Sequence, residues 1–300
     1  MSDFDVQRNA LKRLTGSYAV ELEGYYRDAL RDIRRQLARA YEKYAQEGML
    51  DMATMTKYKR LENLEMSITQ QLNGLNAKSA GTTTRAIKGV YSDSYYRTGF
   101  LVEKEAQAKL GFGDLNSKKV EAVVKNPFDP VGWPARVREN TLLTNRRIRE
   151  EVAQGLIQGQ PYQTTANAIS RQMGMSAGRA NRIVTTESHR AQMTGRLDGI
   201  KQAESAGVIT ERVWVATLDG DTRDQHGDMD GRTAEQDGTF ILPDGTVTEG
   251  PGLSGVAEHD INCRCDVIVN VAGYEPEFRR ARGEGIIPYQ SYHQWKSARI

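Results

Sequence analysis

Cysteine is almost absent from this 300-residue chain, which has two, and proline is scarce, with eight. Two cysteines allow at most one disulfide within the chain, and few prolines leave room for long uninterrupted helices. No apolar run approaches the roughly 18 residues that a membrane-spanning helix requires. The first residues also lack the basic and then apolar layout of a signal peptide. We therefore expect a chain made in a reducing cytoplasm, without a membrane partner.

Sequence motifs of catalysis are missing as well. The chain has no glycine-rich phosphate loop, no Ser-His-Asp set and no His-Glu-x-x-His motif. An acid–base pair of Glu187 and His189 is disfavoured, because residues two apart on a helix do not face each other. We therefore expect no enzymatic activity and no small-molecule substrate.

The small net charge of +2 conceals two regions of opposite sign. Residues 211–300 contain nine Lys and Arg against sixteen Asp and Glu, a net charge of −7, so residues 1–210 carry +9. Regions of opposite charge favour different partners.

A helix with one basic side is predicted near the N-terminus. Apolar residues recur from Leu22 in steps of four, four and three, a period of about 3.67 residues that fits a nearly straight α-helix. The other side carries Arg27, Arg31, Arg34, Arg35 and Arg39. These arginines suit contacts with DNA phosphates or with an acidic protein surface, and an ordinary solvated face is the alternative.

Helical patterning continues through the first two thirds of the chain. Further helices are expected over residues 54–75, 84–109, 136–157, 164–173 and 177–206. Three prolines within residues 126–134 indicate a linker. The predicted regions are an N-terminal helical region (1–125), the proline-rich linker (126–135), a second helical region (136–210), a small α+β module (211–272) and a tail (273–300).

Beyond residue 207 the pattern changes from helix to strand. Residues 212–217, 239–242 and 266–271 alternate or cluster apolar side chains as strands do, and Pro243-Asp-Gly245 is a turn signal. Trp214 and Phe240 are the expected core of this module, and Asp219 and Asn262 are expected to support its loops. The predicted fold class is α+β, mostly α, in which an extended helical region precedes a small antiparallel-strand module.

A metal site is the strongest chemical hypothesis for this module. Both cysteines and two of the four histidines lie close together in it, as His226, His259, Cys263 and Cys265. Four such ligands suit a structural Zn²⁺ ion, which would compensate for a small core. Reduced cysteines without metal and a strained Cys-x-Cys disulfide are the alternatives. A calcium loop fits poorly, because its first and last ligands would be His226 and Asp237 rather than a carboxylate and a glutamate.

The same module resembles the phage Mu F-like minor head proteins, the phage head morphogenesis family. The resemblance covers roughly residues 154–271. It rests on Val184-Thr-Thr-Glu-Ser-His-Arg190, Trp214-Val-Ala, Asp219 with Thr222, Met229-Asp-Gly231, Phe240 near Pro243, and His259 followed by Asn262-Cys-Arg-Cys265. Many members carry a Cys-x-x-Cys after the aspartate, and the matching positions here are Arg223 and His226.

The resemblance implies a structural protein of a tailed phage. Such a protein is assembled in the bacterial cytoplasm and lies in the virion, in the capsid interior or at the portal vertex. Its implied partners are the portal protein, and further packaged DNA, scaffold or major capsid protein. Two rival functions are a zinc-dependent hydrolase with Glu258 or Asp224 as base, and a DNA-binding accessory protein outside the virion.

Overall fold

The computed structural model describes residues 3–125, 131–271, 278–281, 284–288, 290, 294 and 297. Four long helices dominate it: α1 (Asp3–Tyr44), α3 (Arg60–Ala106), α5 (Trp133–Ile157) and α6 (Tyr162–Ser205). The short helical elements are α2 (Met52–Thr56), η1 (Lys57–Lys59), α4 (Ser117–Lys125), α7 (Asp224–Asp228) and α8 (Ala257–Asp260). Small antiparallel sheets follow the long helices, which confirms the predicted α+β, mostly α class.

The chain divides into two compact units, and α1, α3 and α6 contribute residues to both. Unit 1 comprises residues 1–16, 85–130 and 185–300, and unit 2 comprises residues 17–84 and 131–184. The predicted region boundaries were drawn along the sequence and stay predictions. Residues 126–130 of the predicted linker and most of the predicted tail lie outside the described residues.

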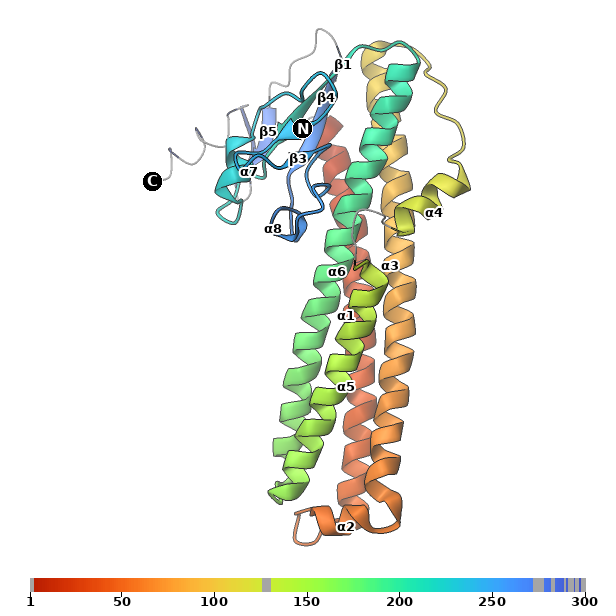
Figure 1. Ribbon diagram of the computed structural model, residues 1–300, viewed down its shortest axis with the longest axis vertical. Helices are drawn as coiled ribbons and strands as arrows, with labels where there is room; N and C mark the ends of the chain where they lie inside the picture. The colour runs from red at the N-terminus through yellow and green to blue at the C-terminus, as the bar shows by residue number, and fades with distance from the viewer. Residues whose placement is uncertain are drawn as a thin grey trace. The chain divides into compact units, whose positions relative to one another are not determined.

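Unit 2 is a bundle in which segments of α1, α3, α5 and α6 run side by side (Figure 1). Each helix turns an apolar stripe inward, and the core residues include Ile33, Leu37, Ile68, Leu72, Ile148, Val152, Ile169 and Met173. A set of polar side chains lies within this core. Asn140 donates to the Tyr26 hydroxyl at 3.1 Å, and Thr144 donates to the Ser176 hydroxyl at 2.6 Å. Buried polar side chains are tolerated here because they bind each other.

The helical part of unit 1 is built on a close approach of α6 to α3. Gly195 and Gly199 are four residues apart and so lie on one face of α6. A Cβ atom at Gly195 would lie 2.3 Å from the Tyr91 carbonyl oxygen, and one at Gly199 would lie 3.0 Å from Thr98 Cβ. Because the two helices are this close, the Ser94 hydroxyl donates a hydrogen bond to the Gln192 carbonyl at 2.7 Å. Glycine at these two positions is therefore required by packing.

The strand module of unit 1 contains three two-stranded antiparallel sheets among the described residues. Strands β1 (Thr210–Val215) and β4 (Asp266–Val271) pair along their whole length, with Trp214 opposite Val267. The shorter pairs are β2 (Phe240–Ile241) with β3 (Val247–Thr248), and β5 (Phe278–Ala281) with β6 (Gly285–Pro288). The β4 bounds match the predicted strand, whereas the β5–β6 hairpin falls where a tail was predicted.

Several predicted helix ends are wrong. Separate helices were predicted over residues 54–75 and 84–109, but α3 is continuous from Arg60 to Ala106. The predicted break near residues 174–176 is also absent, since α6 runs unbroken from Tyr162 to Ser205. Helix α4 was not predicted, and α1 begins at Asp3, well before Leu22, where the predicted apolar repeat starts. No helix among the described residues is long and apolar enough to cross a membrane.

Candidate metal centre

Two short loops of the module deliver the cysteines and a histidine to one place. His226 lies on the single-turn helix α7 and is buried. On the other loop, α8 ends at Asp260 and the chain reverses at Asn262, whose φ of 56° is a left-handed conformation that asparagine tolerates. The reversal sets Cys263 and Cys265 immediately before β4, and alternation along the extended chain turns both side chains inward.

The three side chains form a tight, buried cluster. Their ligand atoms all lie within 4.8 Å of one another, and the residues are between 1% and 4% exposed. Nδ1 of His226 lies 3.6 Å from Cys263 Sγ and 3.7 Å from Cys265 Sγ. Both cysteines are free thiols. One imidazole and two sulfurs are soft ligands, so this cluster has the chemistry to bind a metal ion.

His259, the fourth predicted ligand, lies behind His226 rather than beside the sulfurs. Its Nδ1 is 3.3 Å from Nε2 of His226, and the two rings stack at 5.5 Å between centroids. Its Nε2 contacts Asp244 at 2.8 Å. Both ring nitrogens of His259 therefore have partners outside the cluster.

The electrostatics of the cluster distinguish the two thiols. The hydrogen bond with Cys265, together with burial, raises the pKa of the Cys263 thiol. The same hydrogen bond lowers the pKa of Cys265, and His226 adds to that effect. The backbone N–H of Thr246 and then His259 donate to Asp244 and lower its carboxyl pKa to about 2. A site with one thiolate already favoured is well prepared for a cation.

Asp219 joins the two loops next to the cluster. Its carboxylate binds the Arg264 guanidinium through two contacts of 2.5 Å and 2.9 Å. It also accepts hydrogen bonds from the Asp221 backbone and the Thr222 hydroxyl. Arg264 lies between the two cysteines in the sequence. This bidentate contact therefore fixes the cysteine loop against the loop that leads to α7.

Trp214 and Phe240 pack around the cluster. Both are buried in the same apolar group as Cys263, Cys265 and Met229. The Trp214 ring meets Phe240 edge-on at 5.4 Å and His226 at 5.5 Å. These contacts surround the cluster with apolar side chains. Asp224 and Glu258, the two candidate bases of the hydrolase alternative, are both exposed.

Helix α6 contacts the cysteine loop through hydrogen bonds. His189 Nε2 lies 2.8 Å from the Cys265 carbonyl, and the Asn262 N–H donates to the Thr186 hydroxyl at 3.4 Å. Glu187 forms a buried ion pair with Arg190 at 2.9 Å instead of facing His189. The conspicuous Glu-Ser-His-Arg segment thus has a structural role in these contacts.

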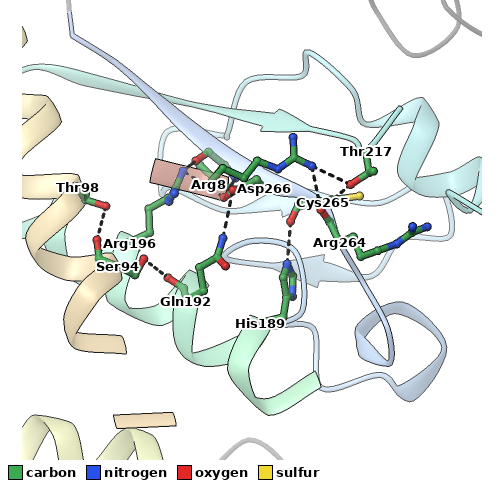
Figure 2. Close-up of polar contacts among 11 residues, drawn as sticks. Arg8, Ser94, Thr98, His189, Gln192, Arg196, Thr217, Arg264, Cys265 and Asp266 are labelled. Atoms are coloured by element: carbon green, nitrogen blue, oxygen red, sulfur yellow. Dashed lines mark hydrogen bonds and ion pairs between the residues drawn. The ribbon is translucent and has the colours of Figure 1, made fainter. Parts of the chain in front are cut away.

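The N-terminal part of α1 reaches the same loop. Figure 2 shows Arg8 directed at Thr217 and at the Arg264 carbonyl, with N–O distances of 3.0 Å and 3.4 Å. It also shows His189 beneath Cys265, and Arg196 and Gln192 around Asp266. Arg8, His189 and Asp244 were not predicted as site residues. His189 and Asp244 stood out in the sequence only within a helical segment and a turn, and the contacts that bring all three to the site depend on the fold.

The predicted basic residues lie on α1 within unit 2, away from this cluster in the chain. Arg27, Arg31, Arg35 and Arg39 are exposed and Arg34 is partly buried. Arg31 pairs with Asp28 at 2.9 Å and Arg35 with Asp32 at 3.2 Å. Such exposed pairs are weak, typically below about 1 kcal/mol, so these arginines remain available to a stronger anion.

Comparison with known proteins places the chain in a class of phage head proteins. The family model described as Phage Mu protein F like protein matches residues 146–268. The chain is 30% identical over 280 residues to "Minor head protein GP7" of Bacillus phage SPP1, covering 92% of this chain and 90% of that protein. The chain therefore belongs to the phage Mu F-like family of minor head proteins.

A second relative carries a different name. "NAD(+)--arginine ADP-ribosyltransferase EFV" of Enterococcus faecalis (strain ATCC 700802 / V583) is 27% identical over 285 residues. The match covers 93% of this chain but 57% of that protein. No solved structure matches the chain.

Proposed function

We propose that this chain is a structural component of a tailed-phage head that acts in head morphogenesis, associates with the portal and contacts packaged DNA. The observation that carries the proposal is the similarity to a minor head protein across 92% of the chain, which includes both compact units. A match confined to the module would support only a shared domain.

The distribution of charge supports different partners for α1 and for the loops of the strand module. From Arg27 to Lys43, α1 has six basic residues against three acidic ones. From Asp219 to Asp260, the module loops have eleven acidic residues against two basic ones, a net charge of −9. Acidic loops repel DNA phosphates, so DNA contact belongs to α1 and the loops suit a basic protein surface.

The ADP-ribosyltransferase name of the second relative suggests an enzyme as the other candidate. The chain leaves 43% of that protein unmatched (100 − 57). We assign the activity in its name to the unmatched part, so this chain would act without catalysis. Transfer of ADP-ribose from NAD⁺ to an arginine-rich protein by the purified chain would contradict that assignment.

Mass spectrometry of gradient-purified virions and procapsids tests the head assignment. Peptides of this chain are expected in both particles, at far fewer copies than the major capsid protein. Portal association predicts that the chain is recovered with portal rings after the capsid shell is dissociated. Its absence from both particles would overturn the proposal and leave an accessory DNA-binding role outside the virion.

Replacing Arg27, Arg35 and Arg39 by glutamine is expected to weaken DNA binding. Each lost phosphate contact should lower the slope of log affinity against log salt by about 0.9. The measurement is fluorescence anisotropy with a labelled duplex over a series of salt concentrations. The matched control replaces Lys109, Lys118 and Lys119, which are also exposed and lie in unit 1. Equal slopes for the two triple variants would exclude α1 as the DNA-binding face.

A further inference from the structure

The spacing of the sulfurs and the imidazole around His226 is that of ligands sharing one ion. Zinc binds sulfur at about 2.3 Å and imidazole nitrogen at about 2.05 Å, so a tetrahedral site separates the two ligand atoms by roughly 3.6 Å. The observed separations are 3.6 Å to Cys263 and 3.7 Å to Cys265. Both nitrogen–sulfur separations therefore match those of a tetrahedral site.

The contacts behind His226 determine which of its nitrogens carries the proton. Asp244 is a carboxylate and can only accept, so Nε2 of His259 is the donor in their 2.8 Å contact. In a neutral His259 the other nitrogen, Nδ1, is then an acceptor, and Nε2 of His226 must donate to it across 3.3 Å. That leaves a lone pair on Nδ1 of His226, which faces both sulfurs. The row Asp244–His259–His226 thus prepares the histidine as a metal ligand.

A fourth protein ligand is not supplied by the described residues. Among them, the group of His, Cys, Asp and Glu side chains that closes on a single point contains His226, Cys263 and Cys265 alone. Two thiolates balance the charge of one divalent cation, which matters because all three residues are buried. Both sulfurs bind the ion as thiolates, so binding releases to solvent the protons that the thiols still carry.

We propose that His226 Nδ1, Cys263 and Cys265 bind one Zn²⁺ ion, with an exchangeable water molecule as the fourth ligand, and that Asp244 and His259 are positioning residues for His226. The ion would link α7 to the residues just before β4 and so hold these two parts of the module together. This assignment stands apart from the role in the phage head, because metal binding is measured on the purified chain alone.

A pair of matched turns provides the decisive test. Asp244 and Asp237 both lie in Asp-Gly-Thr turns and accept the backbone N–H of the following threonine, at 3.0 Å and 2.9 Å. Only Asp244 also contacts His259. In Asp244→Asn the amide would donate to His259 and reverse the proton order along the row, which puts a proton on His226 Nδ1. Asp237→Asn changes the same charge and leaves His226 untouched.

Zinc affinity is measured by competition with a chromophoric chelator on the full chain. Asp244→Asn is expected to bind zinc about 10- to 100-fold more weakly than the wild type, whereas Asp237→Asn should match the wild type. His226→Ala and the Cys263→Ser and Cys265→Ser variants should lose stoichiometric binding. Equal affinities for the two aspartate variants, or a wild type that binds less than one zinc per chain, would overturn the proposal.

The fourth position is tested with cobalt in place of zinc. The charge-transfer band of the Co²⁺-loaded chain should correspond to two thiolates, and the visible bands should shift when azide is added and replaces the water. A spectrum that azide leaves unchanged would exclude an exchangeable ligand and favour His259 as the fourth one. Circular dichroism of each metal-free variant separates loss of the ligand from loss of the fold.

Discussion

Gly195→Ala is expected to destabilise the chain by about 1–3 kcal/mol through overpacking of α6 against α3. The new methyl group would lie 2.3 Å from the Tyr91 carbonyl oxygen and 3.2 Å from Ser94 Cβ. The first of these is backbone in the middle of α3, so it cannot move aside as the end of a flexible side chain would. The helices must separate, and the Ser94 hydrogen bond to Gln192 would lengthen. Urea unfolding measures the loss in free energy.

The same helix provides the control for this substitution. Gly178 lies in the interior of α6, and a Cβ atom there would meet nothing within 4 Å. Gly178→Ala should therefore stabilise the chain by roughly 0.5–1 kcal/mol, because alanine is the better helix former. If both variants changed stability in the same direction and by similar amounts, the close approach of α6 to α3 would be wrong.

Asp266→Ala is expected to cost about 3–5 kcal/mol, because it strands a buried arginine. Arg196 contacts Asp266 at 3.1 Å, and their side chains are 3% and 1% exposed. Arg196 also donates to the Val267 carbonyl at 2.7 Å, and the Phe4 ring lies 4.8 Å from its guanidinium carbon. Burial lowers the pKa of Arg196, but a guanidinium keeps its proton near neutral pH. The uncompensated charge would have to draw in water or expel the side chain, loosening β4.

Two further variants test whether the cost comes from the stranded charge. Glu249→Ala breaks the exposed Lys201–Glu249 pair, whose side chains are both 51% exposed, and should cost less than about 1 kcal/mol. Arg196→Met combined with Asp266→Leu removes both charges and should recover part of the stability lost in the single variant. Thermal unfolding of all three, followed by tryptophan fluorescence, gives the comparison. A double variant as unstable as Asp266→Ala would mean that shape, rather than charge, dominates at this position.

The long helices show where sequence patterns mislead. Separate helices were predicted over residues 164–173 and 177–206, yet Gly174 and Gly178 both lie within α6, with open space where a side chain would be. Each glycine costs about 1 kcal/mol in a helix. The buried residues on either side, Ile169, Met173 and Ala180, outweigh that cost by packing into the bundle of unit 2. Tertiary packing of this kind is not visible to a local pattern.

The module was more predictable, because its signals are local. The pattern of residues 266–271 correctly predicted the bounds of β4. His226, Cys263 and Cys265 lie in one stretch of the sequence, and this correctly indicated that they cluster. Asp244 was recognised only as part of a turn. Its contact with His259 depends on the fold of the loop between β2 and α8, and nothing in Pro243-Asp-Gly245 announces it. Whether His259 is itself a metal ligand or only contacts His226 likewise depends on the orientation of its ring, which the sequence does not specify.

The contact of Arg8 with Thr217 and Arg264 has a consequence for folding. These partners are separated by 209 and 256 positions along the chain. Unit 2 is complete once residue 184 has been synthesised, whereas unit 1 combines residues 1–16 and 85–130 with residues 185–300. Contacts of such long sequence separation form slowly, because a large loop must close first. On a translating ribosome the helical bundle of unit 2 can therefore form early, whereas the contacts of the start of α1 form only after the module has been synthesised.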